Sequence, residues 1–192
     1  LPAAELRGFT GILNSTTNMI LEMMEQGKTF EQAVAHCQQI GIAETDPTLD
    51  VAGWDAANKL VIVANSVLGV EATLADVAET GITSVTAAHL AHAAAQGATI
   101  KLLATAARGA DPAGGGYTLA VAPTVTRADS FLGQGHGWEM GVEIESDLYR
   151  RMYHKIWERE PLPTAAAMLR DAVNLWTRDG SPARPGQAAP DW

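Results

Sequence analysis

The chain has 192 residues, of which 47% are hydrophobic, and its formal net charge at pH 7 is -9. This length can bury one sizeable core, and the negative charge opposes binding to nucleic acid, whose phosphates are also negative. There is no apolar stretch of membrane-spanning length, and no signal peptide is expected. The single cysteine, Cys37, excludes an intrachain disulfide. We therefore expect a cytoplasmic protein without nucleic-acid or membrane partners.

The first half of the chain is expected to combine one short strand with several helices. Apolar residues at helical spacing, and the glycines that follow them, set the boundaries. In order, the sequence predicts a strand at residues 9–13 and helices at 16–26, 30–40, 55–68, 74–80 and 86–96. Thr86 is a candidate cap for the last of these helices. Residues 42–52 are expected to be mostly loop, because Pro47 and several Asp and Thr residues disfavour regular structure.

The second half changes to the two-residue period of strands. It predicts, in order, a hairpin of strands 99–107 and 117–125, a strand pair at 138–144 and 149–157, and a helix at 164–176. From residue 180 onwards, three prolines and few large apolar residues predict a loose tail. We therefore expect one domain over residues 1–179 and a tail over residues 180–192.

This order of elements predicts an α+β fold. A mixed, partly antiparallel β-sheet should be covered by helices on one face.

Four acids and one lysine gather in a short part of the chain. They are Glu44, Asp46, Asp50, Asp55 and Lys59. Asp55 and Lys59 are spaced i, i+4 and share one face of the expected helix. Lys59 is the only cation among residues 56–68, which are mostly apolar, so it is a candidate proton donor beside a carboxylate. The alternative is a structural ion pair, and the spacing alone favours that alternative.

Ordered blocks around this cluster resemble the catalytic domain of homoserine dehydrogenase. The blocks are GILNSTTN (11–18), GIAE (41–44), GITSVT (81–86), IKLLA (100–104), APTV (122–125) and LPTAAA (162–167). The resemblance implies the same α+β architecture and a part in the reversible, NAD(P)-dependent interconversion of L-homoserine and L-aspartate 4-semialdehyde. It also implies a homodimer that forms through the sheet domain, with an uncovered sheet face or edge as the contact surface.

The resemblance assigns roles to individual residues. Lys59 matches the family's catalytic lysine, which would protonate the forming alkoxide, and Asp55 matches the acidic partner that orients this lysine or holds the substrate. Glu44 and Asp50 match carboxylates that bind the amino end of homoserine. Asp46 precedes Pro47 and is equally well explained as a turn residue.

Residues 14–18 lie where the first strand is expected to pass into a helix. Exposed backbone N–H groups and hydroxyls there could meet a polar ligand, although capping is the ordinary role of such residues. Alignment with the family's Asn-Gly-Thr block assigns Ser15 and Thr16 to substrate or nicotinamide contact. Ser15 replaces a glycine of the family and Ile42 a tyrosine, so we expect a more crowded and more apolar pocket.

Two departures from the family pattern concern the cofactor. The chain has no Gly-x-Gly-x-x-Gly turn, and it begins where the family's dinucleotide-binding domain would be finishing. We therefore expect NAD or NADP to be bound mainly by an N-terminal domain absent from this chain, with no cofactor-binding residue here. Residues 153–160 replace a glycine-rich segment that helps close the cofactor site in the family. The glycines at 114–116 are explained by the hairpin.

Two other functions stay open. One is a related oxidoreductase with a different small substrate, which Ser15, Ile42 and the missing glycines support. The other is a non-catalytic binding or dimerisation module, which a nucleotide-binding domain in the same reading frame would argue against. His136 and His154 are expected to be ordinary surface or loop histidines rather than catalytic ones, and no metal site is expected. The large aromatic residues Trp138, Trp157 and Trp176 either pack in the core or contribute to the dimer contact.

Overall fold

The computed structural model describes residues 4–109, 116–157, 159 and 162–177. The chain divides into two compact units, residues 1–157 and residues 158–192. The described part of the second unit is a helix, α6 (Leu162–Thr177). The expected domain boundary at residue 179 and the expected tail both lie outside the described residues. No described helix has both the length and the apolar content that a membrane span needs.

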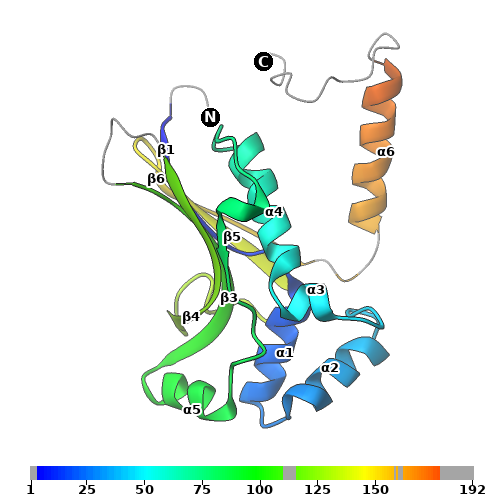
Figure 1. Ribbon diagram of the computed structural model, residues 1–192, viewed down its shortest axis with the longest axis vertical. Coiled ribbons are helices and arrows are strands. Elements are labelled where there is room, and N and C mark those ends of the chain that lie inside the picture. Colours follow the sequence, from blue (N-terminus) through cyan, green and yellow to red (C-terminus); the bar gives the residue numbers. More distant parts are fainter. Residues whose placement is uncertain (1–3, 110–115, 158, 160–161, 178–192) are drawn as a thin grey trace. The chain divides into compact units, whose positions relative to one another are not determined.

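A six-stranded sheet organises the first unit (Figure 1). Its strands are β1 (Leu6–Ile12), β2 (Val77–Glu79), β3 (Ala98–Arg108), β4 (Tyr117–Arg127), β5 (Glu139–Ser146) and β6 (Arg150–Trp157). They lie in the order β2-β4-β3-β1-β5-β6. The β2–β4 pair is parallel and every other pair is antiparallel. The predicted mixed, partly antiparallel sheet is therefore confirmed.

Helices of the first unit cover one face of the sheet (Figure 1). Helices α1 (Ser15–Glu25), α4 (Trp54–Ser66) and α5 (Ala87–Ala95) pack on strands, while α2 (Phe30–Gln39) packs on α1 and α3 (Thr48–Val51) packs on α4. Strand register explains which side chains meet them, since Phe9 lies beside Ala106 on one side and Ile144 on the other. These three residues belong to the main core, whereas Ile12 packs with Leu103 in a separate small cluster. The α+β fold with helices on one face is thus confirmed.

One predicted helix is wrong. Residues 74–80 form a single 3-10 turn, Leu74–Asp76, followed by β2. The turn is closed by Asp76, whose Oδ2 accepts bonds at 2.8 Å from both the backbone N–H and the hydroxyl of Thr73. The chain then extends and pairs with β4, so tertiary pairing overrides the local helical pattern. Residues 42–52, expected to be mostly loop, contain the short α3.

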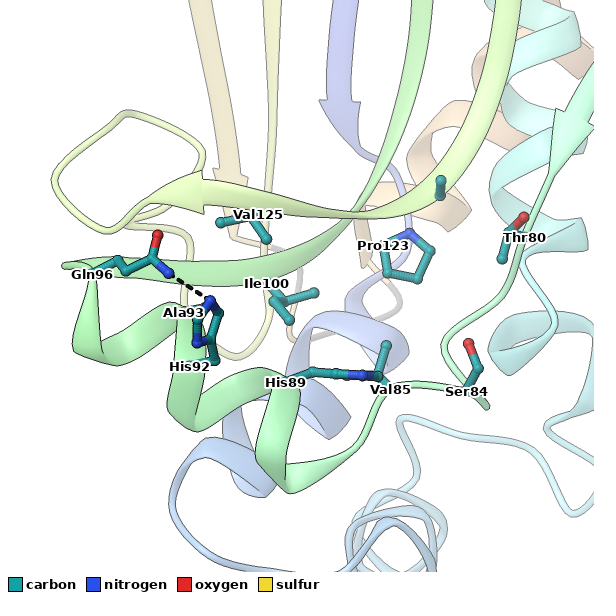
Figure 2. A pocket seen from close by; sticks show the side chains of 11 residues that line it. Thr80, Ser84, Val85, His89, His92, Ala93, Gln96, Ile100, Pro123 and Val125 are labelled. Atoms are coloured by element: carbon teal, nitrogen blue, oxygen red, sulfur yellow. Dashed lines mark hydrogen bonds between the residues drawn. The ribbon is translucent and has the colours of Figure 1, made fainter.

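The edge of β4 is open beyond the three-residue β2. A cavity of about 520 Å³ lies between this edge and α5 and is lined by His89, His92, Pro123 and Val125 among others (Figure 2). The Val121 carbonyl accepts from the Thr80 N–H, so the backbone polar groups of Val121 point away from β3. Those of Pro123, two residues further along the strand, point to the same open side. Proline has no N–H to offer, which disfavours the addition of another strand there.

Candidate active site

The acidic cluster forms where three elements meet: the end of β1, the first turn of α1, and the α3–α4 corner. Gly53 joins α3 to α4 with φ +92°, a left-handed conformation that side-chain-bearing residues rarely adopt. This turn brings Asp50 of α3 and Asp55 of α4 to the same amide group, that of Asn14. A β-carbon at residue 53 would also lie 3.1 Å from Glu79 Oε1. A residue with a side chain would therefore strain the turn that brings the two aspartates together.

Asn14 joins the two aspartates. It is the N-cap of α1, and its Oδ1 accepts from the Thr17 N–H at 2.8 Å. That bond fixes which way the amide points, so Nδ2 faces the carboxylates and donates to Asp50 Oδ1 at 2.7 Å and to Asp55 Oδ2 at 2.8 Å. Asn14 is only 6% exposed. Capping thus orients a buried donor toward two negative charges.

Lys59 completes the network from the next turn of α4. Its Nζ donates to Asp55 Oδ2 at 2.8 Å and to the Leu13 carbonyl at 3.0 Å. An ammonium has three donors, and within the described residues the third makes no recorded bond. The Lys59 side chain is 46% exposed, so it can reach a ligand that lies over the cluster. The predicted Asp55–Lys59 pair is present, and it continues through Asn14 to Asp50.

Asp50 has a perturbed carboxyl group. Burial raises its pKa, and the negative charge of Asp55 acts in the same direction. The hydrogen bond from Asn14 and the positive charge of Lys59 lower the pKa, but the net shift is upward. A carboxylate that is poorly compensated in the free protein would be stabilised by an added cation such as the ammonium of an amino acid.

Of the remaining predicted site residues, two lie beside the cluster and one lies outside its hydrogen bonds. Thr16 is buried beside the cluster, where its hydroxyl donates to the Ile42 carbonyl at 2.9 Å and lies near enough to Asp50 to lower the pKa of that carboxyl. Ser15 is the first residue of α1, directly after Asn14. Glu44 is exposed on the α2–α3 loop, and its recorded hydrogen bond is accepted by its backbone carbonyl, from Gln38. The structure does not bring Glu44 into the network of hydrogen bonds.

Asp46 is accounted for by local structure. Its Oδ1 accepts from both the N–H and the hydroxyl of Thr48, and these bonds lower the pKa of Asp46. Asp46 therefore stabilises the start of α3, as the turn interpretation expected. Among the described residues, no group of three acids, histidines or cysteines is arranged to hold a metal ion.

Residues 153–157, which belong to the segment that departs from the family's glycine-rich pattern, form the end of β6. Tyr153 of β6 packs against Phe131 with ring centroids 4.9 Å apart, and Trp157 ends the same strand. His136 makes a contact of 3.2 Å with Glu22 of α1, and His154 is exposed on β6. Gly116 is described, but the rest of the glycine run at 114–116 lies outside the described residues.

Asp50→Asn is expected to raise the melting temperature at pH 7 by about 1–3 °C. The pKa of Asp50 is higher in the folded than in the unfolded protein, so the protonated carboxyl stabilises the fold at a pH below its unfolded-state pKa. This stabilisation is lost as the pH rises through the folded-state pKa. At pH 7 the ionised group therefore destabilises the fold, and the amide removes that cost. The gain should disappear near pH 3, where the wild-type carboxyl is itself protonated.

Thermal unfolding at both pH values measures this effect, with Asp46→Asn as the matched control. The pKa of Asp46 is lowered, so its removal should decrease stability at pH 7. A melting temperature that falls in the Asp50 variant would contradict the assignment of Asp50 as a poorly compensated charge.

Comparisons with known proteins give a consistent result. The homoserine dehydrogenase family model matches residues 1–173. A homoserine dehydrogenase of Methanocaldococcus jannaschii is 37% identical over 177 residues, which are 92% of this chain and 50% of that protein. An NAD(+)-dependent homoserine dehydrogenase of Pseudomonas canavaninivorans is 34% identical over 175 residues, or 91% of this chain and 49% of that protein.

Solved structures agree in fold. The crystal structure of Staphylococcus aureus homoserine dehydrogenase superposes with a TM-score of 0.82 at 28% identity and covers 98% of this chain and 47% of that one. This chain spans about half the length of the curated relatives it matches. With the family model matched over most of its residues, the chain belongs to the homoserine dehydrogenase family.

Proposed function

We propose that this chain is the substrate-binding and catalytic portion of an enzyme that interconverts L-homoserine and L-aspartate 4-semialdehyde. The observation that carries the proposal is the network in which Asn14 joins Asp50 to Asp55 and Asp55 holds Lys59. It offers negative charge for an ammonium and, beside it, a proton donor for an aldehyde oxygen. Membership of the homoserine dehydrogenase family supports the same reaction.

The negatively charged residues would bind the substrate, and Lys59 would transfer the proton. Asp50, with Glu44 from the adjoining loop, would hold the α-amino group of the substrate, because fixed anions bind an ammonium strongly. When a hydride reaches the aldehyde carbon, the oxygen becomes an alkoxide and needs a proton. Lys59 would donate that proton from Nζ, and in the reverse direction the neutral amine would remove it. Asp55 and the Leu13 carbonyl would keep Nζ in place between these steps.

A nicotinamide cofactor would supply the hydride, but the described residues do not fit a dinucleotide site. Strand β1 passes into α1 through Asn14 and Ser15 rather than through a glycine-rich turn, and its neighbours are antiparallel. We therefore propose that NAD or NADP is held mainly by another part of the complete protein. The NAD(+)-dependent relative supports a nicotinamide cofactor without deciding between the two.

The direct test is oxidation of NADH and NADPH by the complete protein with L-aspartate 4-semialdehyde. We expect turnover with at least one cofactor and formation of L-homoserine in equal molar amount. A folded complete protein that binds cofactor but forms no homoserine would instead support the alternative of a different small substrate. A folded complete protein without cofactor binding would support a binding or dimerisation module.

We also propose that the complete protein is a homodimer joined through the face of the sheet opposite the helices. On this face small residues such as Gly8, Thr10 and Thr105 line a hollow of about 520 Å³, rimmed by Glu145 and Arg151. Small side chains allow close approach, and charges of both signs suit the contact of one surface with its own copy. Thr10 pairs with Glu143, and Glu143 pairs with Tyr153, so these three side chains lie on one face of the sheet. Trp157 is four residues after Tyr153 on the same strand, so its exposed side chain lies on this face as well.

Thr10→Arg is expected to convert the dimer to a monomer, because it places an added charge at the centre of this face. Sedimentation velocity of the complete protein measures the change. Thr83→Arg, at an exposed position in the turn before α5, is the matched control and should stay dimeric. A monomeric wild-type protein, or a Thr10→Arg variant that stays dimeric, would contradict the proposed interface.

A further inference from the structure

Lys101 is a buried lysine on the central strand β3, and it takes no part in the cluster around Lys59. It is 2% exposed. Its Nζ donates to Asn18 Oδ1 at 2.9 Å and to the Gly135 carbonyl at 2.6 Å. Burial lowers the pKa of Lys101, while the charges of Glu25, Glu22 and Glu139 act to raise it. A buried ammonium is costly unless hydrogen bonds and charges compensate it, so this position is built for a lysine.

Asn18 links Lys101 to the segment around Gly137 and Glu139 through hydrogen bonds. It is 1% exposed, and its Nδ2 donates to the carbonyls of Gly137 and Glu139 at 3.1 and 3.3 Å. The amide is oriented by Lys101, because only its oxygen can accept from an ammonium. Lys101 and Asn18 together therefore tie α1 to β3 and to the loop that precedes β5.

These contacts lie on the face of α1 that leads to the cluster. Asn18 and Glu22 are four residues apart and share one face of α1, and Asn14, the N-cap of the helix, stands four residues before Asn18. Glu22 Oε2 accepts from the Gly137 N–H at 2.7 Å, next to the bonds of Asn18. The Asn18 N–H also bonds to the Asn14 carbonyl at 3.4 Å. A rotation of α1 about its axis would break these bonds and turn the Asn14 amide away from Asp50 and Asp55.

We propose that Lys101 is a positioning residue for the active site, acting through Asn18 on the rotation of α1 and hence on the Asn14 amide. Asp50 and Asp55 come from α3 and α4, so their distance to Asn14 depends on how α1 is held. The effect on turnover rests on the proposed function, whereas the effect on α1 does not.

Lys101→Met tests the proposal in the complete protein, beside Lys28→Met. Lys28 is the matched control because it is an exposed lysine just beyond α1, and within the described residues its Nζ has no recorded bond. We expect kcat with L-aspartate 4-semialdehyde to fall about tenfold or more in the Lys101 variant, since small displacements of catalytic groups are costly. The Lys28 variant should stay within about twofold of wild type. Equal kcat values per folded molecule in the two variants would overturn the proposal.

A double variant separates positioning from stability. If Lys101 acts through Asn14, adding Lys101→Met to Asn14→Ser should lower kcat no further than Asn14→Ser alone. Losses that multiply would show that Lys101 acts by another route and would overturn the proposal. Should Lys101→Met fail to fold, Asn18→Asp replaces it, because the carboxylate keeps Lys101 paired while the donor to the loop is lost.

Hydrogen exchange measured by mass spectrometry gives a readout that does not need turnover. Peptides covering residues 13–21 should exchange faster in the Lys101 variant than in wild type, with the Lys28 variant unchanged. Unaltered exchange in this segment would refute the positioning role even if the enzyme were active. Faster local exchange in a protein without activity toward the semialdehyde would support positioning and count against the proposed function alone.

Discussion

Lys59→Met in the complete protein is expected to lower kcat with L-aspartate 4-semialdehyde by about 100-fold or more. The variant removes the only described lysine whose ammonium lies in the Asp50–Asp55 network, and with it the proton that the forming alkoxide requires. The melting temperature should change by no more than about 2 °C, because the lysine is 46% exposed and exposed ion pairs contribute about 0–1 kcal/mol. Steady-state kinetics and thermal unfolding measure the two effects.

Two further variants sharpen this result. Lys28→Met removes an exposed lysine just beyond α1 and should leave kcat unchanged. Lys59→Arg keeps a cation but not a group that can readily release its proton, so turnover should stay low. Unchanged turnover in Lys59→Met would remove this residue from the mechanism. Loss of folding would instead favour the structural ion pair.

Asn14→Ser is expected to lower kcat/KM by about 10–100-fold, and any loss of stability should come from the two broken bonds to Asp50 and Asp55 rather than from the helix cap. Serine is as good an N-cap as asparagine, so the first turn of α1 should persist. It has no amide to bridge Asp50 and Asp55, and a hydrogen bond to a charged group is worth about 1.5–3 kcal/mol. Released from Asn14, the two carboxylates repel each other and Asp55 no longer holds Lys59 in a fixed place. The same kinetic and unfolding measurements apply.

Asn14→Ala is the companion variant, because it removes both the bridge and the cap. It should show the same kinetic loss as the serine variant and a further loss of about 1 kcal/mol in the free energy of unfolding. If the serine variant had wild-type kinetics and only the alanine variant were destabilised, Asn14 would be a helix cap without a role in the site.

Much of the fold could be predicted because its elements carry strong local patterns. Apolar residues at helical spacing locate α1, α2, α4 and α5, and Thr86 caps α5 as expected, with its hydroxyl accepting from the His89 N–H. Strand β2 could not be found in this way. It is three residues long, and its conformation depends on pairing with β4, some forty residues further along the chain.

The site could be predicted where the contacts are local. The four-residue spacing of Asp55 and Lys59 places them together on any helix. The bonds from Asn14 to Asp50 and Asp55 span 36 and 41 residues, so no local pattern indicates them. One partial indication was present in the sequence, because an asparagine that caps a helix through its amide oxygen still has two amide hydrogens to donate to other groups. Lys101 offered another, since it is the only charged residue between Ala98 and Ala107, which are otherwise almost all apolar.

The most direct test of this account compares two aldehydes that differ only in the α-amino group. With the complete protein and its nicotinamide cofactor, kcat/KM should be about 100-fold or more higher for L-aspartate 4-semialdehyde than for succinate semialdehyde, because Asp50 and Glu44 have an ammonium to bind only in the first. Asp50→Asn should reduce that ratio. Equal kcat/KM values for the two aldehydes in the wild-type protein would contradict the assignment of this acidic cluster as the amino-acid site.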